Sequence, residues 1–142
     1  MGFSVSAAAA IIGVAVLISI ELMVANVIPT ITDTQDSYDE MKDRAINQIQ
    51  TDINITNVVT SINGSNYDHN VTVENTGSTS LETTKFDILI NGVKQTFVCS
   101  KIYLHPENIV YFNVTNLVGA GDKRVKIVTD NAISDYYDYI IT

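Results

Sequence analysis

The sequence predicts an N-terminal transmembrane α-helix followed by an all-β domain, an antiparallel sandwich of two sheets. Three observations lead to this fold class. The first 30 residues contain a single charged side chain, the segment after them has a helical period, and from Ile53 onward the apolar residues follow the two-residue period of strands. A chain of 142 residues has room for one small domain and an attachment.

Residues 1–30 are the predicted membrane anchor. From Val5 to Ile28 only Glu21 is charged, and a helix of that length, about 36 Å, can cross a hydrocarbon core of about 30 Å. Secretory signals carry basic residues before the apolar run. A prepilin-type signal would need Lys or Arg beside Gly2, and neither feature is in the sequence. We therefore expect an uncleaved anchor.

Glu21 is an unusual residue for a membrane segment. It precedes Ile28 by seven residues, which puts it about 10 Å inside the end of a straight helix. An ionised carboxylate that faces lipid at this depth is costly. Two interpretations stay open: the side chain reaches the interface or is protonated, or it contacts a partner helix in the membrane. Small residues spaced by four, such as Ala9 and Gly13, would allow close helix packing.

Residues 31–51 are predicted to form a helical stalk. Pro29 is expected to end or kink the first helix, because it lacks an N–H group. Beyond it an apolar stripe recurs every three or four residues, at Tyr38, Met41, Ala45 and Ile49. The stripe is too short to predict a coiled coil, so docking onto its own domain and pairing with a second copy both stay open.

Residues 52–142 are the predicted β domain. Asn91-Gly92 between FDILI and VKQTF is the strongest turn signal, because a two-residue hairpin turn needs two positive φ angles. Without a Cys–Trp–Cys pattern, the domain is immunoglobulin-like in architecture only. The predicted strands are Ile53–Ile62, Asn70–Glu74, Lys85–Ile90, Lys94–Val98, Ser100–Leu104, Ile109–Asn116, Arg124–Thr129 and Tyr136–Ile141.

Charge and composition exclude several classes of function. The formal net charge is −8, with 16 acidic and 8 basic residues, so nucleic acid is not an expected partner. His69 and His105 are both next to turn residues and are expected on the surface. GAGD at Gly119–Asp122 lacks the ending of a phosphate loop. We predict no catalytic, cofactor or metal site, and hence no enzyme.

Two groups of residues are candidate sites of another kind. Near the end of the chain, Asp135 and Asp138 alternate with Tyr136, Tyr137 and Tyr139. This pattern is typical of a solvated strand face, or of an aromatic edge strand that binds another chain. Four N-x-[ST] sequons are candidate N-glycosylation sites and favour a C-terminal domain outside the cell. They are Asn54, Asn63, Asn70 and Asn113.

Several stretches of the chain resemble a known family. MGFSVSAAAAIIGVAVLIS, VTVENTGSTSL, FDILINGV and KIVTDNAISDYYDY are similar to the small archaellum (archaeal flagellum) accessory proteins FlaF and FlaG. The MGFS opening and the ISDYYDY ending resemble FlaF more closely. The resemblance implies a single-pass membrane protein with a cytoplasmic N-terminus and a sandwich in the pseudoperiplasm. It also implies binding to the surface-layer protein, a companion accessory protein, a homodimer, and a role in the stator.

The first hypothesis for function is therefore a non-enzymatic stator component that anchors the membrane machinery to the surface layer. The alternative is an archaellin- or pilin-like filament subunit, which has the same order of apolar helix and β domain; the missing basic residue before Gly2 counts against it. A solute-binding ectodomain is a third hypothesis. It would need a formed pocket with convergent polar groups.

Overall fold

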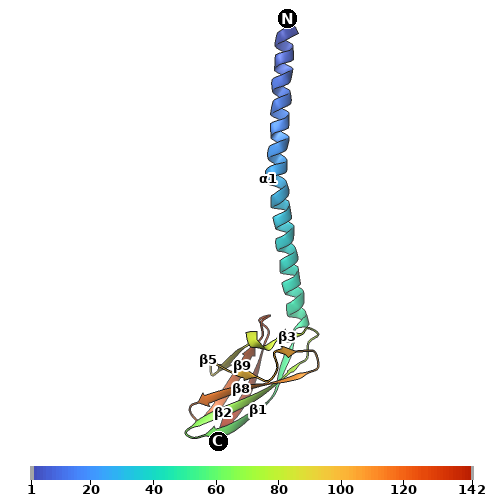
Figure 1. Ribbon diagram of the computed structural model, residues 1–142. Helices are drawn as coiled ribbons and strands as arrows, with labels where there is room; N and C mark the ends of the chain where they lie inside the picture. Colours follow the sequence, from blue (N-terminus) through green and yellow to red (C-terminus); the bar gives the residue numbers. More distant parts are fainter. Residues whose placement is uncertain (1, 142) are drawn as a thin grey trace. The chain divides into compact units, whose positions relative to one another are not determined.

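A computed structural model describes residues 2–141, with side chains from Ser4 onward (Figure 1). The chain divides into two compact units, one that ends at Asp43 and one that begins at Arg44. The first unit is helical. The second contains the end of the same helix and all the strands described.

Helix α1 (Gly2–Gln50) is continuous and includes Pro29. Of the two expected effects of Pro29, an end of the first helix does not occur, and the predicted anchor and stalk share one helix. The helix continues because Pro29 removes only one backbone hydrogen bond, the bond to the carbonyl of Ala25. In apolar surroundings, an unfolded turn would leave several backbone N–H and C=O groups without a hydrogen bond. By length and composition, α1 can cross a membrane.

The strands of the second unit form two four-stranded antiparallel sheets and a small third one. The first sheet has the order β1 (Ile53–Asn63), β2 (Asn66–Asn75), β8 (Ile109–Leu117) and β6 (Val98–Cys99). The second sheet has the order β10 (Ser134–Ile141), β9 (Gly121–Val128), β4 (Asp87–Ile90) and β5 (Val93–Gln95). The third pairs β3 (Leu81–Glu82) with β7 (Tyr103–Leu104).

The core lies between the first and second sheets. Val71 and Phe112 project inward from the first sheet, and Ile88 and Ile127 from the second; all four are completely buried. Every second residue of a strand points to the same face, so the alternating pattern of the sequence puts these side chains together. The predicted sandwich is confirmed.

Turn chemistry explains where strands begin and end. Asn91 and Gly92 have φ angles of 49° and 83°, and Ile90 pairs with Val93, so the predicted hairpin is confirmed. The strand predicted over Lys94–Val98 is instead two strands, β5 and β6, because the chain leaves the second sheet after Gln95 and joins the first at Val98. A short 3-10 turn, η1 (Thr83–Lys85), precedes β4.

A turn of the sandwich is bonded directly to the end of α1. The N–H of Ser78 donates to the carbonyl of Gln50 at 2.9 Å, and the N–H groups of Thr76 and Gly77 donate to the carbonyl of Asp52 at 3.1 and 3.0 Å. A Cβ atom on Gly77 would lie 2.5 Å from both the Asp52 nitrogen and the Gln50 oxygen. Only glycine allows the two backbones to come this close.

Candidate interaction surfaces

The three neighbouring tyrosines of strand β10 point to two different faces of the second sheet. Tyr136 is 53% exposed, while Tyr137 and Tyr139 pack against the core. The two-residue period of a strand causes this division: Tyr137 and Tyr139 point inward, and Tyr136 points to the outer face of the second sheet. An aromatic contact with another chain would therefore use Tyr136.

The outer face of the second sheet carries paired charges beside Tyr136. Lys126 is opposite Tyr136 in the register, and its Nζ atom lies 5.0 Å from the centre of the tyrosine ring, the geometry of a cation–π contact. On the adjacent strands, Lys94 Nζ lies 2.6 Å from a carboxylate oxygen of Asp87. Aromatic and charged side chains that are already fixed by neighbours suit a contact with another protein.

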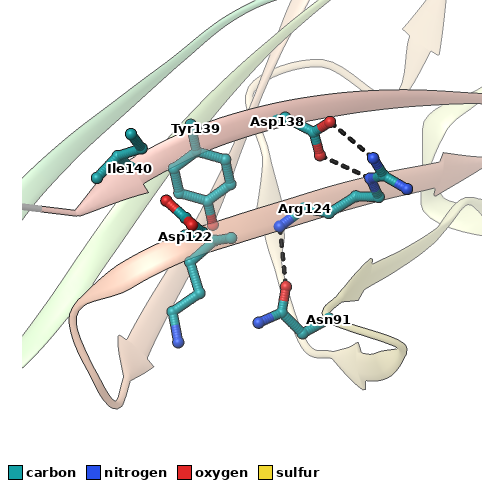
Figure 2. A pocket seen from close by; sticks show the side chains of 7 residues that line it. Asn91, Asp122, Arg124, Asp138, Tyr139 and Ile140 are labelled. Carbon is teal, nitrogen blue, oxygen red and sulfur yellow. Dashed lines mark hydrogen bonds and ion pairs between the residues drawn. The ribbon is translucent and has the colours of Figure 1, made fainter.

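The best-defined charge pair of this face is between β9 and β10 (Figure 2). Arg124 donates two hydrogen bonds to the carboxylate of Asp138, at 2.6 and 2.7 Å, and its backbone N–H donates to Asn91 Oδ1 at 2.8 Å. These bonds from Arg124 lower the pKa of Asp138. The pair is solvent-exposed, so it adds little to stability. A shallow groove runs beside it, lined also by Asp122, Lys123, Tyr139 and Ile140.

His69 is buried in β2, and the expectation that it lies on the surface is wrong. Its ring meets that of Tyr139 edge to face at 5.1 Å, and its Nδ1 atom lies 3.3 Å from Thr60 Oγ1. Burial lowers the pKa of His69 and raises that of Tyr139 to about 12. The sequence pattern could have predicted this burial. Alternate residues of a strand share one face, so residue 69 lies on the same inward face as Val71 and Val73.

His105 is exposed, as the sequence predicts. Its Nδ1 atom lies 2.8 Å from Ser80 Oγ, and its ring stacks on Tyr103. A nucleophilic serine also needs an acid that orients the histidine, and no acid in the described part of the chain bonds to His105. In residues 2–141 no group of three His, Cys, Asp or Glu side chains is placed to hold a metal ion.

The four sequon asparagines are all exposed and all belong to the first sheet. Asn54 and Asn63 lie on β1, the second of them at the hairpin to β2. Asn70 on β2 and Asn113 on β8 are directly opposite each other in the register. No local pattern predicts that pairing, because 43 residues separate the two positions.

Glu21 differs from the other polar residues of the apolar helix. Ser19 and Asn26 donate their side-chain hydrogen bonds to the carbonyls of Ala15 and Leu22, each at 2.8 Å. These bonds satisfy the polar groups inside the helix itself. Glu21 forms no such bond with any described residue. An apolar surface beside it includes Ile18, Leu22, Val24 and Ala25.

Comparison with known proteins shows the fold. No protein-family model and no curated protein sequence matches the chain. The archaellum periplasmic stator protein FlaG from Sulfolobus acidocaldarius aligns with a TM-score of 0.55 at 16% identity, over 63% of this chain and 99% of that one. The chain shares the fold of archaellum proteins.

A second solved structure aligns over more of the chain. The archaeal flagellum of Methanospirillum hungatei strain JF1 aligns with a TM-score of 0.73 at 14% identity, over 94% of this chain and 92% of that one. The complex of FlaF and FlaG from Sulfolobus acidocaldarius aligns over 61% of this chain, with 16% identity and a TM-score of 0.49. The alignments with FlaG and with the archaeal flagellum confirm, for the fold, the resemblance noted in the sequence.

Proposed function

We propose that this protein is a non-enzymatic structural component of the archaellum motor, part of the stator that connects the membrane machinery to the surface layer. One observation carries the proposal: a β-sandwich with the fold of an archaellum periplasmic stator protein follows a helix that can cross a membrane. The N-terminus is cytoplasmic in this proposal, and the sandwich lies in the pseudoperiplasm beneath the surface layer.

The bonds at the end of α1 suit such a role. A stator must pass force between its anchor and the domain that grips the envelope. Backbone hydrogen bonds from Thr76, Gly77 and Ser78 attach the sandwich to residues 50–52, so the connection there is not a free linker.

The partners in this proposal are proteins. The surface-layer protein is the envelope partner, and a companion archaellum accessory protein and a second copy of the chain are the others. The outer face of the second sheet is the candidate contact surface, because Tyr136 offers exposed aromatic area beside the paired charges of Lys126, Arg124 and Asp138. In the membrane, Glu21 is the candidate contact with a partner helix.

A truncation after Thr51 tests the gripping role of the sandwich. We expect the truncated protein to stay in the membrane at normal abundance, while the cells lose motility. The abundance is measured by immunoblot of membranes, and motility by microscopy. Normal motility in the truncated strain would overturn the proposal.

A filament subunit is the second candidate. The observation in its favour is the alignment with the archaeal flagellum of Methanospirillum hungatei, which covers 94% of this chain, including both the helix and the sandwich. Filaments sheared from cells distinguish the two functions. A subunit would be a major protein of the filaments, with an intact mass that shows loss of a leader, whereas a stator component would remain in the membranes at its full mass.

A further inference from the structure

Three of the four sequons lie on the outer face of the first sheet. Asn54, Asn70 and Asn113 each precede a fully or nearly fully buried residue of the core in the same strand, so their own side chains point away from the core. All three are exposed. The fourth, Asn63, lies at the exposed hairpin between β1 and β2, where Gly64 has a φ angle of 64°.

Strand geometry also presents the second half of the motif. A hydroxyl two residues after the asparagine is on the same face of a strand. Thr72 follows Asn70 and Thr115 follows Asn113 in this way, and neither threonine is buried. In the folded domain, the asparagine side chain and the threonine hydroxyl of these two sequons therefore lie on the same outer face, which is compatible with glycosylation there.

The centre of this outer face is uncharged. One row of paired residues crosses the four strands, and a second row lies beside it. The first row is Val59, Asn70, Asn113 and Val98; the second includes Asn57, Thr72 and Tyr111. Val98 and Val59 are 73% and 54% exposed. A neutral face with amides, hydroxyls, exposed valines and an aromatic ring suits contact with a sugar, which has apolar C–H surfaces and many hydroxyl groups.

We propose that the outer face of the first sheet is N-glycosylated. The donor is an oligosaccharide linked through phosphate to a polyprenyl lipid. The side-chain nitrogen of Asn forms a bond to the anomeric carbon, the bond from that carbon to the phosphate oxygen breaks, and a transferase base takes the amide proton. The lipid phosphate is the leaving group. This proposal rests on the proposed location of the sandwich outside the cell.

Modification of Asn70 excludes modification of Asn113 on the same molecule. Residues that are opposite in an antiparallel pair have Cβ atoms only about 5 Å apart. The first sugar on one asparagine fills the space directly in front of the other. Each chain therefore carries at most three glycans: one on Asn54, one on Asn63, and one on either Asn70 or Asn113.

Glycans on the first sheet leave the second sheet for protein partners. A sugar layer over Val59, Val98 and Tyr111 would cover the exposed apolar residues at the centre of that face. The outer face of the second sheet contains no sequon, and Tyr136 stays accessible there. The two faces of the sandwich thus have different roles.

The test is the intact mass of the full-length protein purified from its own cells, with glycopeptide mapping. We expect a maximum of three glycans. Asn54→Gln or Asn63→Gln lowers this maximum by one. Asn70→Gln leaves it at three, because Asn113 is then modified, while the double variant at 70 and 113 lowers it to two. Asn57→Gln is the matched control, since Asn57 is exposed on the same face but outside a sequon.

Two results would overturn the proposal. Protein without glycans overturns it entirely, and a species with four glycans overturns the exclusion between Asn70 and Asn113. Labelling of Lys85 on whole cells with a membrane-impermeant amine reagent separates this failure from that of the proposed function, because Lys85 is exposed and lies in η1, outside the proposed contact surface. A labelled but unglycosylated protein means that the location holds and the glycan proposal fails, whereas an unlabelled protein means that the location itself is wrong.

Discussion

Substitution of Gly77 by alanine tests how the end of α1 is attached to the sandwich. The new Cβ atom would lie 2.5 Å from the Asp52 nitrogen and from the Gln50 oxygen, and 3.1 Å from the carbonyl carbon of Thr51. All of these are backbone atoms, so no side chain can rotate away. The turn must move outward instead.

The expected cost follows from the bonds that this movement breaks. The hydrogen bonds from Ser78 to Gln50 and from Gly77 to Asp52 are 2.9 and 3.0 Å long, and a shift that relieves the overlap lengthens them beyond bonding distance. Each is worth about 0.5–1.5 kcal/mol, and alanine returns part of this through the unfolded chain. We expect a net loss of about 1–2 kcal/mol, which lowers Tm by roughly 4–16 °C for a domain of this size.

The assay is thermal unfolding of the full-length protein in detergent micelles, followed by near-UV circular dichroism of the tyrosines. Ser78→Ala is the matched control, because it changes the next residue of the same turn, keeps the backbone N–H and adds no new atom. We expect its Tm to stay within about 3 °C of the unmodified protein. An equally small change for Gly77→Ala would refute the role of the close approach.

Three further predictions concern single side chains. Burial lowers the pKa of His69 in the folded protein, so near the ordinary histidine pKa of about 6.5 the unfolded chain binds more protons than the folded one. The free energy of unfolding is therefore highest above that pH and falls as the pH drops through the folded pKa. In His69→Gln, the free energy of unfolding measured in urea between pH 5 and 7 should depend less on pH. Tyr136→Ala should reduce recovery of the envelope partner at least several-fold with an unchanged Tm, whereas Tyr111→Ala, which removes a tyrosine of similar exposure from the first sheet, should not. Glu21→Gln and Glu21→Leu should both reduce recovery of the membrane complex, unlike Leu22→Ala; unchanged recovery in both Glu21 variants would refute the partner contact.

The helical and the two-residue periods of the apolar residues in the sequence predicted most of the fold. The absence of charge before and after Glu21 predicted the apolar helix, and alternation around FDILI and VKIV predicted strands that meet in the core at Ile88 and Ile127. Asn91-Gly92 predicted its turn because the backbone geometry needs those residue types. Local chemistry was sufficient for these elements.

Other features depend on tertiary structure. Proline at position 29 has a local preference to end a helix, but the long helix on both sides overrides it. His69 reads as a surface residue next to Asp68 and is buried because its strand continues the inward positions of Val71 and Val73. The pairing of Asn70 with Asn113 depends on the register between β2 and β8, which no local pattern encodes.

The most direct test of the proposed stator function is chemical cross-linking in living cells. The full-length protein is then purified from detergent-extracted membranes, and its partners are identified by mass spectrometry. We expect the surface-layer protein and archaellum accessory proteins to be recovered with it, and the cross-link to the surface-layer protein to be lost after truncation at Thr51. Recovery of neither class of protein, or recovery of the chain mainly in sheared filaments, would contradict it.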